Sequence, residues 1–223
     1  YERAYAQAQD NPDAFWGEAA KRLDWMRAPT QIKDVSYDLK DFRIRWFADG
    51  ELNASVNCLD RHLQRRGDKV ALIFEPDSPD APSQRITYRE LHARVCKLAN
   101  ALRNLGIGKG DRVTIYLPMI PEAAIAMLAC ARIGAVHMVV FGGFAPNSIA
   151  DRVADCGSKL IITADEGLRG GKKVPLKANV DAALKLPGTN SVETVLVVRH
   201  TGGAIDMQMP RDRWFDAVVD AQP

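Results

Sequence analysis

Short apolar runs alternate with segments of helical spacing from residue 70 onward, and this alternation allows only a few folds. The apolar runs predict strands at Val70–Glu75, Arg85–Thr87, Arg112–Leu117, Ala135–Phe141, Lys159–Thr163 and Thr194–Val198. Helices are predicted between them at Glu122–Ile133, Pro146–Asp155 and Ala178–Leu184. Short apolar strands that alternate with helices are typical of a parallel sheet covered on both faces. The sequence therefore predicts an α/β fold with a mostly parallel sheet.

The segment that begins at Thr87 carries the clearest helix signals. Thr87 and Glu90 have the spacing of a capping box, in which the Thr oxygen accepts a backbone N–H and the Glu reaches back. One face of the helix then collects the apolar residues Leu91, Val95, Leu98, Leu102 and Leu105. Gly106 is suited to end the helix in a left-handed cap.

Residues 1–68 differ in composition from the rest of the chain. They hold three of the four tryptophans, many charges and only short, broken apolar runs. A helix is predicted at Ala54–Arg65, where Val56, Leu59 and Leu63 have helical spacing. We interpret residues 1–68 as helices and loops wrapped over a partner surface, and residues 69–223 as the α/β body.

Overall charge and hydropathy argue against two classes of partner. The 30 basic and 28 acidic residues leave a formal net charge of only +2, whereas nucleic-acid binders usually show a larger, clustered basic excess. No run of about 18 apolar residues is present, so no membrane partner is expected. The first residues show no signal-peptide pattern, and because no Met precedes Tyr1 we expect the natural beginning to have been trimmed or to belong to a longer reading frame.

The cysteines and histidines show no pattern of a metal or redox site. No two of the four cysteines form a CxxC pair, so we expect reduced thiols and a cytoplasmic protein. The four histidines lack metal-ligand spacing, and no metal site is predicted. His137 lies in an apolar strand and is predicted to be a satisfied core group.

A basic, glycine-rich segment at Gly167–Lys173 superficially resembles a Walker A loop. Its spacing is one residue short, and Lys173 stands where a Ser or Thr would hold Mg²⁺, so a P-loop is rejected. Gly170 and Gly171 nevertheless expose backbone N–H groups beside Arg169, Lys172 and Lys173, and such a loop can receive a phosphate. The alternative is an exposed basic turn. The preceding Asp165-Glu166 pair is interpreted as local charge balance.

A second glycine pair lies at Phe141-Gly142-Gly143-Phe144, at the end of a predicted strand. Ligands of open parallel sheets bind outside the carboxyl ends of the strands, and glycines there let a ligand approach the backbone. The alternative is a tight turn that needs glycine for its dihedral angles. Because the basic segment also follows a strand, both segments are expected on one rim of the sheet.

Several strings, in order along the chain, resemble the acetyl-coenzyme A synthetase family of adenylate-forming, AMP-binding enzymes. They are Trp46–Asn53, Asn57–His62, Ile115–Glu122, Met127–Ala135, Val139–Phe144 and Ile162–Gly167, the last leading into Arg169. The resemblance implies that residues 69–223 are the first Rossmann-like part of the AMP-binding domain, preceded by the N-terminal wrap of a synthetase.

The resemblance also implies a reaction. Family members form an acyl-adenylate from a carboxylate and Mg·ATP, release pyrophosphate, and transfer the acyl group to coenzyme A (CoA), releasing AMP. The CoA thiol is the nucleophile, so no catalytic residue is predicted in this chain. By motif match, Arg169, Gly170, Gly171 and Lys172 would meet the 3′-phosphate of CoA, with Phe141 and Gly142 beside its nucleotide. Some relatives have Arg at position 172, and Lys keeps the charge but loses the fork.

The resemblance places the ATP, acetate and Mg²⁺ sites beyond Pro223, so the chain alone is expected to be inactive. It implies acetate, ATP, CoA and the remainder of a longer chain as partners. Two alternatives stay open. One is a synthetase for propionate or another short acid, and the other is a non-catalytic CoA-binding, nucleotide-binding or interaction module.

Overall fold

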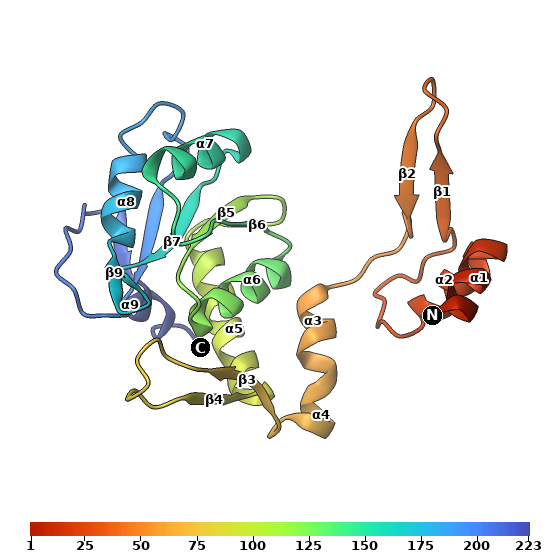
Figure 1. The fold of residues 1–223 in the computed structure, drawn as a ribbon, viewed down its shortest axis with the longest axis horizontal. Helices are drawn as coiled ribbons and strands as arrows, with labels where there is room; N and C mark the ends of the chain where they lie inside the picture. The colour runs from red at the N-terminus through yellow and green to blue at the C-terminus, as the bar shows by residue number, and fades with distance from the viewer. The chain divides into compact units, whose positions relative to one another are not determined.

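The computed structural model describes residues 1–223 as two units, Tyr1–Asn57 and Cys58–Pro223. The core of the second unit is a five-stranded sheet in the order β11-β10-β7-β5-β6, of which Figure 1 labels β7, β5 and β6. Its strands are β5 (Arg112–Tyr116), β6 (Val136–Val139), β7 (Leu160–Ala164), β10 (Thr194–Val198) and β11 (Asp212–Trp214). All neighbouring strands run parallel. The predicted α/β fold is therefore confirmed, as is the predicted strand at Thr194–Val198.

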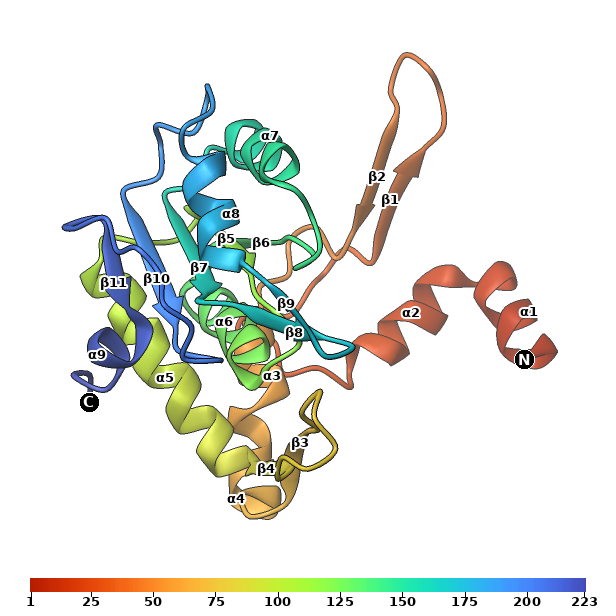
Figure 2. The same ribbon diagram turned by 60° about the vertical axis from the view of Figure 1, so that its left-hand side comes forward.

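Helices cover both faces of this sheet (Figure 2). The chain runs one way from β5 to β6 and the other way from β6 to β7 and β10, so right-handed crossovers place their helices on opposite faces. On one face α6 (Pro121–Ile133) packs against α5 (Tyr88–Asn104), which also contacts α9 (Phe215–Val219). On the other face α7 (Pro146–Cys156) packs against α8 (Leu176–Ala183), which begins two residues earlier than predicted.

The capping signals of α5 are confirmed. The Glu90 N–H donates to Thr87 Oγ1 over 3.2 Å, and the Thr87 N–H donates to Glu90 Oε2 over 2.8 Å. All but the last of the five predicted apolar positions are buried. Gly106 follows the helix with φ +81°, the left-handed conformation that glycine adopts without steric cost. Local sequence thus fixes both ends of the helix and its buried face.

Two segments before α5 differ from prediction. The predicted strand at Val70–Glu75 forms as β3 (Val70–Phe74), but it pairs antiparallel with β4 (Gln84–Thr87) outside the parallel sheet. The predicted helix at Ala54–Arg65 is wrong as a single helix: α3 (Ala54–Cys58), the 3-10 turn η1 (Asp60–His62) and α4 (Leu63–Arg66) follow one another. The break lies at Leu59, whose φ of −122° is not helical and whose side chain is buried.

The prediction for His137 is also wrong. Its strand, β6, is the last strand on one side of the sheet, and His137 is exposed together with its neighbours Val136 and Val139. An apolar strand at a sheet edge has the same residue pattern as a central one, so composition alone did not separate the two cases.

A buried ionic cluster holds α8 to the start of β11. Lys177 Nζ lies 2.7 Å from Asp212 Oδ2 and 2.7 Å from Asp181 Oδ2, and it donates to the carbonyl oxygen of Asp206 over 2.8 Å. The Lys177 side chain is 1% exposed and that of Asp212 0%. Burial alone would raise the pKa of Asp212, but hydrogen bonds from Arg211 and Lys177 hold it below its usual value.

The first unit consists of α1 (Glu2–Asp10), α2 (Pro12–Ala20) and an antiparallel pair, β1 (Lys33–Ser36) and β2 (Arg43–Trp46). Within it the Trp16 and Trp46 rings meet edge to face at 5.8 Å, and Trp25 packs against Phe47 at 5.7 Å. Tryptophan contacts therefore take the place of a continuous aliphatic core in this unit. No helix of either unit has the length and apolar character needed to cross a membrane.

Candidate functional site

The strand order marks one edge of the sheet as the place where a ligand fits. β5 is flanked by β6 on one side and β7 on the other, so the chain reverses its direction of winding at β5. In open α/β sheets ligands bind outside the carboxyl ends of the strands at such a switch point. The loops that leave β5, β6 and β7 at this edge include both glycine-rich segments singled out in the sequence.

The loop after β6 is held by a buried phenol. The Tyr116 hydroxyl lies 2.9 Å from the carbonyl oxygen of Phe144 and 3.3 Å from that of Gly142, and it donates to them. It also accepts a hydrogen bond from Asn179 Nδ2 over 3.1 Å. Burial raises the pKa of Tyr116, so the hydroxyl keeps its proton as a donor. A residue of β5 thus fixes the shape of the loop that follows β6.

The two glycines of this loop make room for their neighbours. Neither has a positive φ, so the alternative of a turn that requires glycine dihedrals is not needed. A Cβ on Gly142 would lie 3.3 Å from the carbonyl oxygen of Leu117, and one on Gly143 would lie 2.7 Å from the ring of Phe141. Close packing of the Phe141 ring on its own loop therefore explains glycine at position 143.

The basic segment after β7 is a small hairpin. β8 (Gly167–Arg169) pairs antiparallel with β9 (Lys172–Val174). Between them Gly170 and Gly171 have φ of +56° and +74°, as a two-residue type I′ turn requires. The predicted basic turn is thus present in the form of a hairpin tip.

The hairpin carries two cations that have no ion-pair partner. Arg169 and Lys172 face each other across the hairpin as the last register pair before the turn, and both are exposed. Lys173 differs, because its Nζ lies 2.7 Å from Glu166 Oε2. A negatively charged ligand therefore meets two unpaired positive charges at the tip.

The structure brings the two predicted segments together. The guanidinium carbon of Arg169 lies 5.3 Å from the centre of the Phe141 ring, within cation–π range. Phe141 also meets Phe144 edge to face at 5.8 Å. A flat aromatic face and a guanidinium thus lie side by side, although they come from loops after different strands.

The backbone N–H groups of the hairpin tip already have a partner. Those of Gly170 and Gly171 donate to the two carboxylate oxygens of Asp77 over 2.9 Å and 2.8 Å. These bonds lower the pKa of Asp77. In this structure the side chains of Arg169 and Lys172, rather than the glycine amides, are the groups left for an anion. Asp77 was missed in the sequence, where the only signal is a proline-rich loop.

The carboxylate pair beside the hairpin has divided roles. Glu166 balances Lys173, as the sequence suggested. Asp165 is instead buried and accepts hydrogen bonds from the N–H groups of Glu166, His200, Thr201 and Gly202. Burial alone would raise the pKa of Asp165, but these bonds lower it. Asp165 therefore ties the end of β7 to the loop after β10.

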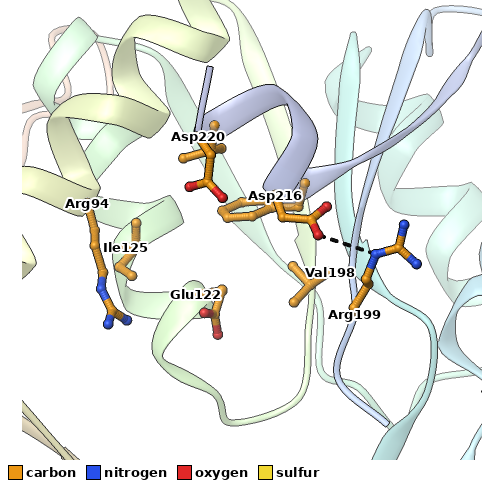
Figure 3. Close-up of a pocket in the computed structure, with 9 residues that line it drawn as sticks. Arg94, Glu122, Ile125, Val198, Arg199, Asp216 and Asp220 are labelled. Carbon is orange, nitrogen blue, oxygen red and sulfur yellow. Dashed lines mark hydrogen bonds and ion pairs between the residues drawn. The ribbon is translucent and has the colours of Figure 1, made fainter. Parts of the chain in front are cut away.

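A separate hollow of about 360 Å³ lies among α5, α6 and α9 (Figure 3). Its charged lining consists of two arginines and three carboxylates, of which Arg199 and Asp216 pair over 3.3 Å. None of the six predicted site residues lines it. Because carboxylates outnumber arginines in this hollow, it repels a multiply charged anion. The β8–β9 hairpin with Arg169 and Lys172 suits such a ligand better. Nowhere in the chain do three or more His, Cys, Asp or Glu side chains gather in a way that could hold a metal ion.

Comparison with known proteins assigns both parts of the chain. Residues 59–217 match the family described as AMP-binding enzyme, and residues 1–58 match the one described as Acetyl-coenzyme A synthetase N-terminus. The chain is 77% identical over 223 residues to an acetyl-coenzyme A synthetase of Xanthomonas campestris pv. campestris (strain 8004). It is 74% identical over 222 residues to one of Xylella fastidiosa (strain 9a5c).

These relatives are longer than this chain. The matches cover 100% of the chain but 34% of each relative, so the chain spans about a third of the length of the proteins it resembles. Among solved structures, the acetoacetyl-CoA synthetase from Streptomyces lividans matches with a TM-score of 0.85 and 24% identity. That match covers 98% of this chain and 32% of the other, and at this identity it supports the fold alone.

Proposed function

This chain belongs to the AMP-binding enzyme family, and from that premise we propose that it is the amino-terminal part of an acetate–CoA ligase. In the proposed reaction, acetate attacks the α-phosphate of ATP and pyrophosphate leaves, which gives acetyl-adenylate. The CoA thiol then attacks the acetyl carbon, and AMP leaves as acetyl-CoA forms. The name shared by the relatives that are 77% and 74% identical supports acetate as the acid.

The part of this reaction that we assign to the chain is capture of CoA. The observation that carries the assignment is the position of Arg169, whose guanidinium lies 5.3 Å from the Phe141 ring centre. The 3′-phosphate and adenine of CoA are likewise an anion and a flat ring joined through one ribose. We propose that Arg169 and Lys172 meet the phosphate, and that the adenine lies beside Phe141 and Gly142.

Arg169 is expected to contribute more to phosphate binding than Lys172. A guanidinium offers two parallel N–H donors to a phosphate, while an ammonium acts as a point charge. Gly170 and Gly171 shape the tip, because a Cβ is strained at their positive φ. No residue here acts as nucleophile or base in this proposal, since the thiol comes with CoA. The chain positions CoA and neutralises its phosphate charge.

The remaining elements of the proposal concern the longer protein. Mg²⁺ would enter as a complex with ATP, and we assign none of its ligands to this chain. Residues 1–68 would form the N-terminal wrap, and residues 69–223 the first part of the AMP-binding domain. All four cysteines are free thiols, which fits a reducing, cytoplasmic location. A related ligase for propionate remains the second candidate, because no residue in this chain is assigned to the acid pocket.

Calorimetric titration with CoA and with 3′-dephospho-CoA tests the CoA assignment. We expect CoA to bind more tightly, and Arg169→Ala to weaken CoA binding about tenfold while leaving dephospho-CoA unchanged. Arg103→Ala is the matched control, because Arg103 is an exposed arginine on α5 outside the rim. Equal affinities for the two ligands in the wild type, or equal effects of the two variants, would show that the rim does not recognise the 3′-phosphate.

Isotope exchange between pyrophosphate and ATP in the presence of acetate separates the ligase from a non-catalytic module. We expect no exchange with this chain alone. Exchange should appear in the longer protein that contains it. A longer protein that binds CoA but shows no exchange with any short carboxylic acid would favour the binding module.

A further inference from the structure

The tip of the β8–β9 hairpin needs support that the hairpin itself does not supply. Each strand has three residues, and an isolated two-stranded hairpin of this size is marginal in water. Gly170 and Gly171 have no heavy atom within 4 Å of where a Cβ would lie, so the turn packs against nothing there.

The charges of Arg169 and Lys172 also destabilise the hairpin tip. Arg169 and Lys172 stand directly opposite each other, and like charges in that arrangement destabilise a strand pair. The Lys173–Glu166 ion pair lies one residue farther from the tip, and its lysine side chain is 59% exposed. The two cations that face the ligand would therefore drive the tip apart unless a counter-charge lies close by.

Asp77 places a negative charge at the turn and supplies the missing contacts. Its two carboxylate oxygens accept one hydrogen bond each from the consecutive N–H groups of Gly170 and Gly171. The two partners lie 93 and 94 residues away along the chain. The contact thus joins the loop between β3 and β4 to the hairpin after β7.

The loop that carries Asp77 is stiff enough to serve as an anchor. Pro76, Pro79 and Pro82 fix three of its φ angles, and the Ala81 N–H donates to the carbonyl oxygen of Ser78 over 3.2 Å. The antiparallel pairing of β3 with β4 holds both ends of the loop. A restrained loop therefore holds the hairpin through the carboxylate of Asp77.

We propose that Asp77 is a positioning residue that fixes the hairpin tip so that Arg169 and Lys172 face the 3′-phosphate of CoA. This inference rests on the CoA function proposed above. Asp77 itself does not touch the ligand. It occupies the glycine amides, which leaves the phosphate to the two side chains.

Two measurements on the 223-residue chain test the proposal. Amide hydrogen exchange at Gly170 and Gly171, followed by NMR, reports the contact directly. Titrations with CoA and 3′-dephospho-CoA report its consequence. We compare the wild type with Asp77→Ala and Asp77→Asn, and with Asp80→Ala as the matched control. Asp80 is an exposed carboxylate of the same loop with no hydrogen-bond or ion-pair partner.

Asp77→Ala should speed exchange at both glycines about tenfold and remove most of the preference for CoA over dephospho-CoA. Asp77→Asn keeps one acceptor oxygen and should be intermediate in both measurements. Asp80→Ala should match the wild type. A purely structural role would lower affinity for both ligands equally, so the ratio of the two affinities is the informative quantity.

Three results would overturn the proposal. Unchanged glycine exchange in Asp77→Ala would show that the contact does not hold the tip. Faster exchange with an unchanged CoA preference would show that the tip need not be fixed. Tighter CoA binding by Asp77→Asn would show that Asp77 competes with the phosphate. If the wild type shows no preference for CoA, the proposed recognition of the 3′-phosphate is wrong, and the exchange data then decide separately whether Asp77 fixes the tip.

Discussion

Replacing Lys177 by Met should destabilise the second unit strongly. Lys177 Nζ contacts both oxygens of Asp181 at 2.8 and 2.7 Å, one oxygen of Asp212 at 2.7 Å and the carbonyl oxygen of Asp206 at 2.8 Å. The lysine side chain is 1% exposed and that of Asp212 0%. Met fills a similar volume without the charge, so the loss reflects the missing ionic partner rather than a cavity.

The size of the effect follows from what stays buried. Removing one partner of a buried ion pair costs about 3–5 kcal/mol, because the other charge is left uncompensated. Asp212 would keep Arg211 Nε at 2.6 Å and the Gln208 N–H at 2.8 Å, so we expect the lower end, about 3 kcal/mol. For a domain of this size that lowers Tm by about 6–12 °C.

Scanning calorimetry of the 223-residue chain measures this shift, with Lys173→Met as the matched control. Lys173 is also ion-paired, but its side chain is 59% exposed, so its loss should cost less than about 1 kcal/mol. The double variant Lys177→Met/Asp212→Asn should lose less than the sum of its single variants, because it buries no unpaired carboxylate charge at position 212. Equal Tm values for Lys177→Met and Lys173→Met would refute the reasoning.

Three further predictions concern the rim. Lys172→Arg should bind CoA more tightly than the wild type, because a guanidinium binds phosphate through two hydrogen bonds and an ammonium acts as a point charge. For the same reason Lys172→Ala should lose less affinity for CoA than Arg169→Ala. Competition titrations compare the affinities of these variants. Tyr116→Phe leaves the carbonyl oxygens of the loop after β6 without their donor, so urea unfolding should show a loss of about 1–3 kcal/mol. The folded-state pKa of Asp165 lies below its unfolded value. The contribution of Asp165 to stability is therefore present above about pH 4 and is lost as the pH falls through the folded-state pKa. In Asp165→Asn the unfolding free energy should depend less on pH in the acid range, and an unchanged pH dependence would contradict this.

The sequence was informative wherever the signal is local. The capping box at Thr87 and Glu90 and the glycine after α5 predicted that helix correctly, because each device acts over a few residues. The apolar strand at Leu160–Ala164, buried at every position, was found to within one residue at each end. Predictions failed where the neighbouring strands in the sheet decide whether a residue is buried. His137 is exposed because its strand lies at the sheet edge, a property that pairing sets.

Several elements gave no local signal at all. β8, β9 and β11 have three residues each, too few for an apolar alternation to stand out. β11 begins at the buried Asp212, where a hydropathy pattern indicates surface. The β1–β2 pair was missed as well, since two of the four residues in each strand are charged.

The residues of the candidate site also differ in whether a local sequence signal identified them. Arg169, Phe141 and the glycine pairs were identified from residue types at strand ends and from resemblance, and the structure places Arg169 against Phe141. Asp77 was not identified. Its partners lie more than 90 residues away, and one Asp in a proline-rich loop looks like any exposed turn residue. Long-range contacts of this kind follow from the fold and not from local sequence.

An NMR titration that compares CoA with 3′-dephospho-CoA tests the central claim most directly. Both ligands should shift the amide signals of Phe141 and Gly142, where the shared nucleotide is expected. Only CoA should shift the signals of Arg169–Lys172, because only it carries the 3′-phosphate. Identical shift patterns for the two ligands, or shifts that centre on the hollow lined by Arg94 and Glu122, would contradict the account.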